Sequence, residues 1–346
     1  MKKTFATLAA FFLLGLSGAS ALEIKSGVIR AVIDETTARV SVYELVDPSK
    51  GRYEPLLFDA DPRTSYATLS FTGKLYRLGD SADYRFTVTK TDTGARIEFR
   101  SASCVVDEDV DFVTSAGSAL ADGLRLTFSM TNVSEKDAAI GLRFLADTWL
   151  AEKSGLHFKT QDRPRIGDET SLDASDAASW LETPGDKADL MIQYRSAGAP
   201  APDRVLLANW KRLNDEPWAF DTVSGRPFTL LPYSINDSAA AFYWQPAAIA
   251  KGSTRTAAII LGVFDAKGYP VERASKEAAT SALYAQTFPM PQGTDVQTQM
   301  AADLLTVREL LAKIDEAMAN GRTPQADEIA AWQKILDRLE ERKKGY

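Results

Sequence analysis

The chain contains little of two residue types that carry much of protein chemistry, with one cysteine and one histidine among 346 residues. A single cysteine, Cys104, cannot form an intramolecular disulfide in any compartment. Its strand-like apolar surroundings predict that it packs as a small hydrophobic residue. A zinc site built from the usual nitrogen and sulfur ligands would have to rely on carboxylates, so we expect no metal site and no cofactor.

Common catalytic motifs are also missing. The sequence has no Gly-x-Ser-x-Gly elbow and no glycine-rich phosphate loop of the P-loop or Rossmann type. The lone His157 could in principle serve a Ser-His-Asp triad, which needs one histidine. Ser154 lies too close to it in sequence to favour a strained nucleophile turn. We therefore predict no catalytic residue and favour a non-catalytic protein, with an enzyme as the open alternative.

The acidic run at residues 107–111 (DEDVD) has oxygen ligands at alternating positions, a pattern that could share a calcium ion. It lacks the spacing of an EF-hand loop and the glycine that the sharp turn of that loop requires. We interpret it as a solvated loop or strand edge.

The N-terminus has the three parts of a secretory signal. Lys2 and Lys3 precede an apolar stretch at 5–16, and Ala19-Ser20-Ala21 fits a small-x-small cleavage site. The apolar stretch is shorter than the roughly 20 residues that cross a bilayer, so we expect a signal peptide at 1–21 that is removed. No cysteine lies near the cleavage site, so we expect no lipoprotein anchor. No later segment is long and apolar enough to predict a membrane span. The sequence predicts a periplasmic protein.

Negative charge dominates the predicted mature chain. Removal of Lys2 and Lys3 moves the formal charge from −7 to −9. An acidic chain is a poor match for nucleic acid or for an anionic membrane surface, and we expect neither as a partner.

Residues 22–265 are predicted to form a mainly β domain, a large antiparallel β-sandwich. Apolar and polar residues alternate in short runs separated by turns, and no β-α-β alternation is visible. The clearest alternating run, at 124–130, is followed by a turn at 132–137, after which the chain returns in the strand at 140–145. The length allows one large sandwich or two small ones, and 154–202 reads as long loops with one or two strands. The predicted strands lie at 29–33, 38–43, 84–89, 96–99, 124–130, 140–145, 204–210, 239–244 and 256–264.

After a linker at 266–293 with a short helix, residues 294–346 predict a C-terminal α-helical hairpin. Asn320-Gly321 can end its first helix, and Thr323 with Pro324 can begin the second. Apolar residues recur at heptad-type spacings of three and four in both arms. They are Met300, Leu304, Val307, Leu311, Ile314 and Met318 in the first arm and Ile329, Trp332, Leu336 and Leu339 in the second.

An isolated pair of helices buries too little apolar surface to be stable alone. The hairpin must therefore dock on its own sandwich or on another chain, either an envelope protein or a second copy. Leu305 and Leu310 widen the apolar stripe, and with Trp332 they are the candidate partner-binding residues.

Aromatic residues beside polar groups suggest a ligand site in the β region. A sugar site needs a flat aromatic face together with carboxylate, amide or guanidinium groups, although tryptophan and tyrosine are also ordinary sandwich-core residues. The candidate ligand-binding residues are Arg143, Asp147, Trp149, His157, Asn209, Trp210 and Trp244.

Three segments carry a family resemblance: 128–134 (FSMTNVS), 141–148 (GLRFLADT) and 244–252 (WQPAAIAKG). They resemble strands of galactose-mutarotase-like supersandwich domains, and the resemblance covers about 22–265. It implies a carbohydrate-type sandwich. That family's epimerases use two histidines with a carboxylate base, and this chain has only His157, so their catalytic set is not carried over. Fold alone does not establish sugar binding.

The sequence as a whole predicts an exported, periplasmic, non-catalytic binding or scaffolding protein. In this interpretation the sandwich recognises a ligand or partner and the hairpin makes protein–protein contact. The alternative is a carbohydrate-binding protein or a mutarotase-like, carbohydrate-active enzyme, with a glycan as its ligand.

Overall fold

The computed structural model describes residues 21–118, 120–173, 175–270 and 326–344, and positions 300, 303, 304, 306–308, 310, 311 and 314. The predicted signal peptide up to residue 20, and the predicted linker from 271 onward with its short helix, lie outside the described residues. The boundaries proposed between signal, sandwich, linker and hairpin therefore stay predictions.

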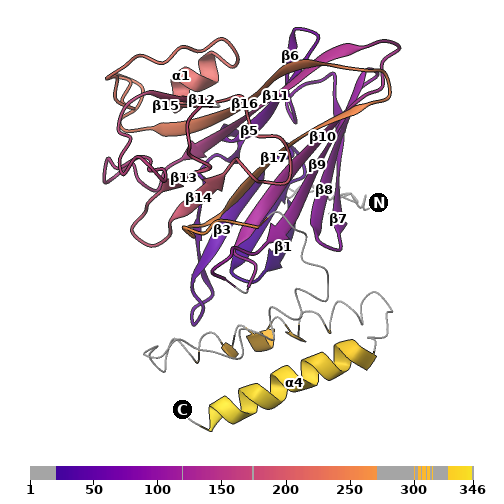
Figure 1. Cartoon of the computed structure of the whole chain (residues 1–346), viewed down its shortest axis with the longest axis vertical. Helices are drawn as coiled ribbons and strands as arrows, with labels where there is room; N and C mark the ends of the chain where they lie inside the picture. Colours follow the sequence, from indigo (N-terminus) through magenta and orange to yellow (C-terminus); the bar gives the residue numbers. More distant parts are fainter. Residues whose placement is uncertain are drawn as a thin grey trace, which may run out of the picture.

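The described residues between 21 and 270 form the large antiparallel β-sandwich of the mainly β fold that the sequence predicted (Figure 1). Its larger sheet has seven strands in the order β13-β14-β17-β10-β9-β8-β7. The strands are β7 (Arg85–Thr91), β8 (Gly94–Arg100), β9 (Cys104–Val113), β10 (Gly123–Asn132), β13 (Trp180–Thr183), β14 (Leu190–Gln193) and β17 (Thr254–Val263).

The second sheet has six strands in the order β12-β15-β16-β11-β5-β6. The short helix α1 (Trp210–Asp215) lies against its outer face, and the 3₁₀ turn η1 (Pro62–Thr64) precedes β5. The strands are β5 (Tyr66–Phe71), β6 (Lys74–Arg77), β11 (Ala138–Thr148), β12 (Thr170–Asp173), β15 (Arg204–Asn209) and β16 (Ser238–Ile249).

A four-stranded antiparallel meander completes the β region at the N-terminal end of the described chain. Its strands are β1 (Ala21–Ser26), β2 (Ile29–Asp34), β3 (Val40–Asp47) and β4 (Arg52–Pro55). The strands predicted at 29–33 and 38–43 form a hairpin, as do those predicted at 84–89 and 96–99, because β2 pairs with β3 and β7 pairs with β8.

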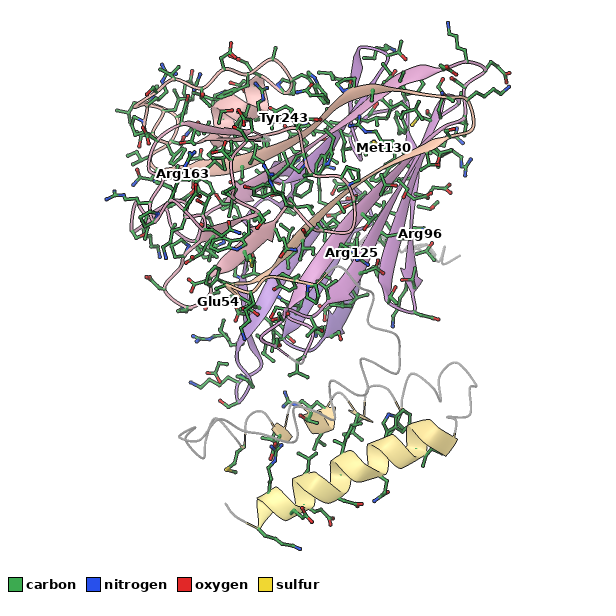
Figure 2. All side chains as sticks on the ribbon, viewed as in Figure 1. Glu54, Arg96, Arg125, Met130, Arg163 and Tyr243 are labelled. Carbon is green, nitrogen blue, oxygen red and sulfur yellow. The ribbon has the colours of Figure 1, made fainter. Side chains whose placement is uncertain are left out.

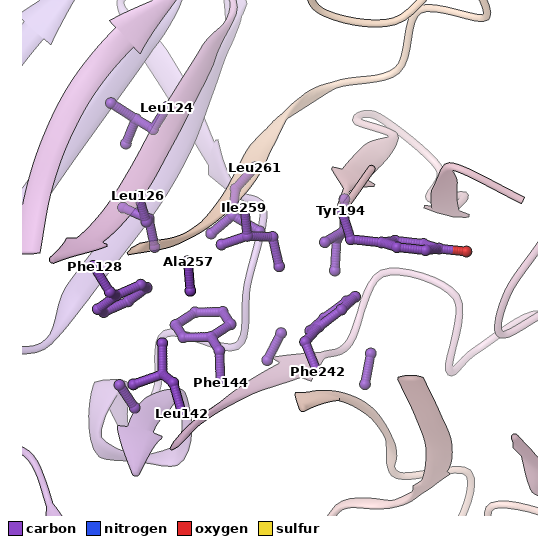
Figure 3. Close-up of a cluster of buried hydrophobic side chains, with 14 of the residues drawn as sticks. Leu124, Leu126, Phe128, Leu142, Phe144, Tyr194, Phe242, Ala257, Ile259 and Leu261 are labelled. Carbon is purple, nitrogen blue, oxygen red and sulfur yellow. The ribbon is translucent and has the colours of Figure 1, made fainter. Parts of the chain in front are cut away.

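The main core lies between the inner faces of the two large sheets. Period-two patterning places alternate residues there, so Leu126 and Phe128 of β10 meet Phe144 of β11 and Phe242 of β16 (Figure 3). Cys104 is fully buried, as its apolar surroundings predicted. A second cluster packs α1 and the following loop on the outer face of the six-stranded sheet; it includes Leu145, Leu206, Leu213, Phe220 and Tyr243.

Two connections between the large sheets meet at the buried Asn132. Its Nδ2 donates to the carbonyl oxygens of Lys136 and Ile249, both at 2.9 Å. Its backbone N–H donates to the Ser253 carbonyl, and the Gly252 N–H donates to the Asn132 carbonyl. The β10–β11 turn and the β16–β17 turn are thereby joined to each other.

Three details differ from the sequence interpretation. The chain returns after the 132–137 turn in the opposite sheet, because β10 pairs with β9 and β17 while β11 pairs with β5 and β16. The described residues of 154–202 form three strands rather than one or two, each four residues long. The run at 107–111 belongs to an inner strand, β9, where Glu108 faces the core with 5% of its surface exposed.

At the C-terminus, the helix α4 (Ala326–Lys343) packs against described positions of the first predicted arm. Trp332, Ile335 and Leu339 form a buried cluster with Leu310. Three partly buried residues adjoin this cluster, Val307 and Ile314 of the first arm and Leu120 of the sandwich. Among the described residues, no helix is both long and apolar enough to cross a membrane.

Candidate functional site

The three tryptophans predicted to bind a ligand use their indole N–H groups to hold neighbouring loops. Trp149 Nε1 donates to the Pro55 carbonyl at 3.2 Å and Trp210 Nε1 to the Thr64 carbonyl at 2.9 Å. Trp244 Nε1 donates to the Pro200 carbonyl at 2.8 Å, and its ring lies in the main core with 1% exposed. Core and loop packing therefore accounts for the polar end of each ring.

Asp147 and Asn209 lie where β11 and β15 end. Asp147 is 5% exposed, and burial raises the pKa of its carboxyl to about 8. Asn209 is the N-cap of α1, and its Nδ2 donates to Phe228 O and Ser234 Oγ, both at 2.9 Å, and to Asp237 O. Both residues anchor the loops at this end of the sandwich.

His157 is a core residue. It is 3% exposed, and its ring meets the Phe228 ring edge-on at 4.6 Å. Burial, with a smaller contribution from Arg165, lowers the pKa of the imidazole to about 4, so it is neutral at physiological pH. Its Nδ1 has no hydrogen-bond partner among the described residues.

Arg143 is fully buried on the outer face of the six-stranded sheet, under α1. Its Nε donates to the Tyr243 hydroxyl at 3.0 Å and its Nη2 to the Leu213 carbonyl of α1 at 2.8 Å. Figure 2 labels Tyr243 on the α1 side of this sheet. The seven candidate ligand-binding residues thus occupy several places in the sandwich, and neither of the two cavities described next is lined by any of them.

The first cavity is internal and small, about 20 Å³, enough for a single water molecule. Arg39, Tyr66 and Glu108 line it together with apolar core residues. Burial raises the pKa of Glu108 to about 8, and the attraction of Arg39 only partly opposes this shift. Glu108 was not among the predicted site residues, although Val106 and Val110, two positions to either side, indicate an inward-facing position.

The second cavity is open, about 280 Å³, and lies between β3 and the loop before β14. Glu44, Asp186, Asp189 and Phe264 are among its lining residues. Burial, and then the charges of Asp189 and Asp122, raises the pKa of Glu44 to about 7. Glu44 Oε2 is buried without a hydrogen-bond partner in the described part of the chain.

Around these sites, no group of three or more His, Cys, Asp or Glu side chains in the described ranges is placed to hold a metal ion. Lys187, which also lines the open cavity, donates to Glu54 Oε1 at 2.9 Å. The open cavity can therefore offer carboxylate oxygens to hydroxyl or ammonium groups, beside the ring of Phe264.

The predicted partner-binding residues of the hairpin have different outcomes. Leu305 lies outside the described residues, while Leu310 and Trp332 are 2% and 8% exposed because they pack the two arms together. Other members of the predicted seam face solvent instead: Met300, Leu304, Leu311, Ile329 and Leu336, each at least 40% exposed.

No protein-family model matches the sequence, and no curated protein matches it either. Solved structures are similar in fold. A galactose mutarotase related enzyme from Lactobacillus acidophilus matches 71% of this chain and 98% of its own, at 13% identity and a TM-score of 0.45. An aldose epimerase homologue from C. elegans matches 71% of this chain and 99% of its own, at 11% identity and a TM-score of 0.42. A polysaccharide lyase matches 70% of this chain with 33% of its own length, at 10% identity and a TM-score of 0.40.

The strand pairing itself shows a large antiparallel β-sandwich, and the galactose-mutarotase-like supersandwich is the kind of domain that the sequence resembles. At these identities the similarity concerns the fold and says nothing about activity or ligand.

Proposed function

We propose that this chain is a periplasmic, non-catalytic binding or scaffolding protein whose C-terminal helices contact a protein partner, either another envelope protein or a second copy. The observation that carries the proposal is the set of apolar side chains exposed on both arms of the hairpin. Leu304 is 61% exposed, Leu311 54% and Ile329 51%, although all three belong to heptad-type patterns. Exposed apolar faces of this kind mark interaction surfaces. Export rests on the signal-like sequence at 1–21.

The non-catalytic part of the proposal is supported by the placement of the polar residues. His157 is neutral and packed against Phe228, and Arg143 is tied to Tyr243 and to α1. A general base must reach a proton on a bound substrate, and a histidine that is 3% exposed is poorly placed to do so.

Replacing Leu304, Ile329 and Leu336 together by Gln should abolish partner contact and leave the fold intact, because all three side chains are exposed. The full chain would be purified from a periplasmic extract under crosslinking, and its mass measured by light scattering. We expect the wild type to be captured as a homo-oligomer or with one defined partner, and the triple variant as a monomer.

Leu75→Gln provides the control, since Leu75 is an apolar residue of the sandwich that is 41% exposed. Its complexes should equal those of the wild type. A wild-type chain that is strictly monomeric and captures the same proteins as the triple variant would refute hairpin-mediated contact. Absence of the chain from the periplasmic fraction would refute export.

A second candidate function, carbohydrate binding, is favoured by the open cavity. Its volume of about 280 Å³ suits a small ligand, and Glu44 and Asp189 can accept hydrogen bonds from hydroxyl groups. The Phe264 ring, which meets Trp180 edge-on at 5.2 Å, adds an aromatic surface.

Titration with envelope sugars should then change the tryptophan fluorescence in a saturable way, because Trp180 contacts a lining residue. At pH 8, above the pKa of about 7, the Glu44 carboxylate is mostly ionised, and Glu44→Gln should raise the Kd about tenfold, the cost of weakening a charge-assisted hydrogen bond. Glu98→Gln, a change at an exposed ion pair on β8, should leave the Kd unchanged. A flat response to every sugar would remove this candidate.

A further inference from the structure

A row of three arginines crosses the outer face of the six-stranded sheet. Arg204 of β15 is paired with Tyr243 of β16, which is paired with Arg143 of β11. Arg143 is paired with Thr68 of β5, and Thr68 with Arg77 of β6. Directly paired residues of neighbouring strands project from the same face, so the three guanidinium groups share one level of the sheet.

Two tyrosine rings bring these guanidinium groups close together. The Cζ atoms of Arg143 and Arg204 lie 5.5 Å and 5.1 Å from the centre of the Tyr243 ring. Those of Arg77 and Arg143 lie 3.9 Å and 6.0 Å from the centre of the Tyr66 ring. Arg143 therefore stands between the other two arginines, with a tyrosine on each side.

Three donors around Tyr243 have no acceptor among the described residues. Arg143 Nη1 and Arg204 Nε are buried without a hydrogen-bond partner. The Tyr243 hydroxyl accepts the Nε–H of Arg143 at 3.0 Å, which leaves its own proton available for an acceptor. A buried donor without an acceptor costs free energy, so three of them at one place call for an acceptor that is not part of the sheet.

Within the part of the chain that the structure describes, two of the three arginines also have no carboxylate partner, while Arg77 has a long ion pair with Asp80. Asp80 is 3.8 Å from Arg77 and pairs more closely with the neighbouring Arg39. In the described chain, Arg143 and Arg204 form no ion pair with a carboxylate, although Arg143 is 0% exposed. A charge removed from water is normally paired, because its desolvation is otherwise uncompensated.

A purely structural role explains only part of this arrangement. Arg143 Nη2 donates to Leu213 O near the C-terminal end of α1, where a cation interacts favourably with the helix carbonyls. Arg77 Nη2 likewise donates to Asn214 Oδ1, which also accepts the Tyr66 hydroxyl. Nothing in α1 occupies Arg143 Nη1 or Arg204 Nε.

We propose that this row is a binding site for an oxyanion, a carboxylate, sulfate or phosphate group of a small ligand, held by Arg143 and Arg204 and the Tyr243 hydroxyl. The planar guanidinium fork matches the oxygens of such groups. Arg204 and Trp218 are half-buried, so the anion enters at this end of the row, where Trp218 meets Tyr243 edge-on at 5.9 Å. The site is independent of the hairpin surface and of the open cavity.

The test uses the purified full chain and three probes at constant ionic strength: glucuronate, inorganic sulfate and neutral glucose. Glucuronate should raise the Tm in a saturable way, and glucose should not at this site. Arg204→Gln and Tyr243→Phe should each raise the Kd for the anion about tenfold, as expected for the loss of a charge-assisted hydrogen bond. Arg96→Gln, which breaks an exposed ion pair with Asp109, is the matched arginine control and should leave the Kd unchanged.

Saturable binding of both glucuronate and sulfate, weakened by Arg204→Gln, supports a site for the oxyanion itself. Binding of glucuronate without sulfate supports a site for an organic carboxylate. The proposal fails if no anionic probe gives a saturable shift, or if the Kd is the same in the wild type, Arg204→Gln and Arg96→Gln. Arg143 is left unchanged because it is part of the core. None of these outcomes depends on whether the helices bind a partner.

Discussion

The free energy of unfolding is expected to fall as the pH rises from 6.5 to 8, because several acids are held protonated inside the sandwich, Glu44 and Glu152 up to a pH of about 7 and Glu108 and Asp147 up to about 8. Burial raises the pKa of Glu108 and of Asp147 from 4.5 and 3.8, respectively, to about 8. In the unfolded chain both are ionised across this range. The folded state therefore binds more protons, and the stability that this contributes is complete below pH 4 and is lost as the pH rises through about 8.

The fall in the free energy of unfolding is predicted only above pH 6.5, because below that pH the titration of His157 makes stability rise with pH. Its pKa is lowered to about 4, so between pH 4 and 6.5 the unfolded chain binds the extra proton and stability rises with pH. Above pH 6.5 that contribution is constant. Each acid then contributes up to about 1.4 kcal/mol per pH unit, and less as the pH nears 8, so the Tm should fall by about 5 °C or more between pH 6.5 and 8.

Thermal unfolding of Glu108→Gln tests this assignment, since the amide fills the same space without a titrating proton. The pH slope should decrease by about 1.4 kcal/mol per pH unit. Arg39 is the charged group whose attraction acts on Glu108, and it keeps its ion pair with Asp80 in this variant. Glu98→Gln, at an exposed position on the adjacent strand β8, should retain the wild-type slope. Equal slopes in all three proteins would show that Glu108 does not titrate as described.

Phe242→Ala should destabilise the protein by about 3–5 kcal/mol. The ring is 0% exposed and lies between the two sheets, 5.7 Å from the ring of Tyr194 (Figure 3). Its removal loses the transfer free energy of the side chain and leaves a cavity that the rigid sheets cannot close. Urea unfolding would show a lower midpoint concentration, with an unchanged dependence of the free energy of unfolding on urea concentration.

Phe58→Ala is the matched change at the surface, because Phe58 is 36% exposed. It should cost about 1 kcal/mol or less. If the two variants have the same unfolding midpoint, the core does not lie where the inner faces of β10, β11 and β16 place it.

Most of the β architecture could be predicted because period-two patterning depends only on neighbouring residues. Leu124, Leu126, Phe128 and Met130 alternate with polar residues, and all four are buried on the inner face of β10. At least one of the three strands between 154 and 202 escaped prediction, since strands of four residues carry too little pattern. Which sheet receives β11 could not be read locally, because pairing is decided by contacts distant in sequence.

The arginine row shows the same limit for function. Arg143 stood out as a polar residue in an apolar strand, whereas Arg77 and Arg204 gave no signal in sequence. They join Arg143 only through the register of four strand pairs. Glu108 is the converse case, because the apolar residues at 106 and 110 share its face and could have shown that the acid points inward.

The junction at Asn132 also limits how such a protein can change in evolution. Because one side chain ties the β10–β11 turn to the β16–β17 turn, an insertion or deletion in either turn would disturb both sheets at once. New chain can be accommodated more easily at the other end of these strands, where the connections following β11 and preceding β16 are long. Related proteins should therefore keep the length of the Asn132 turns and differ in length at the opposite end.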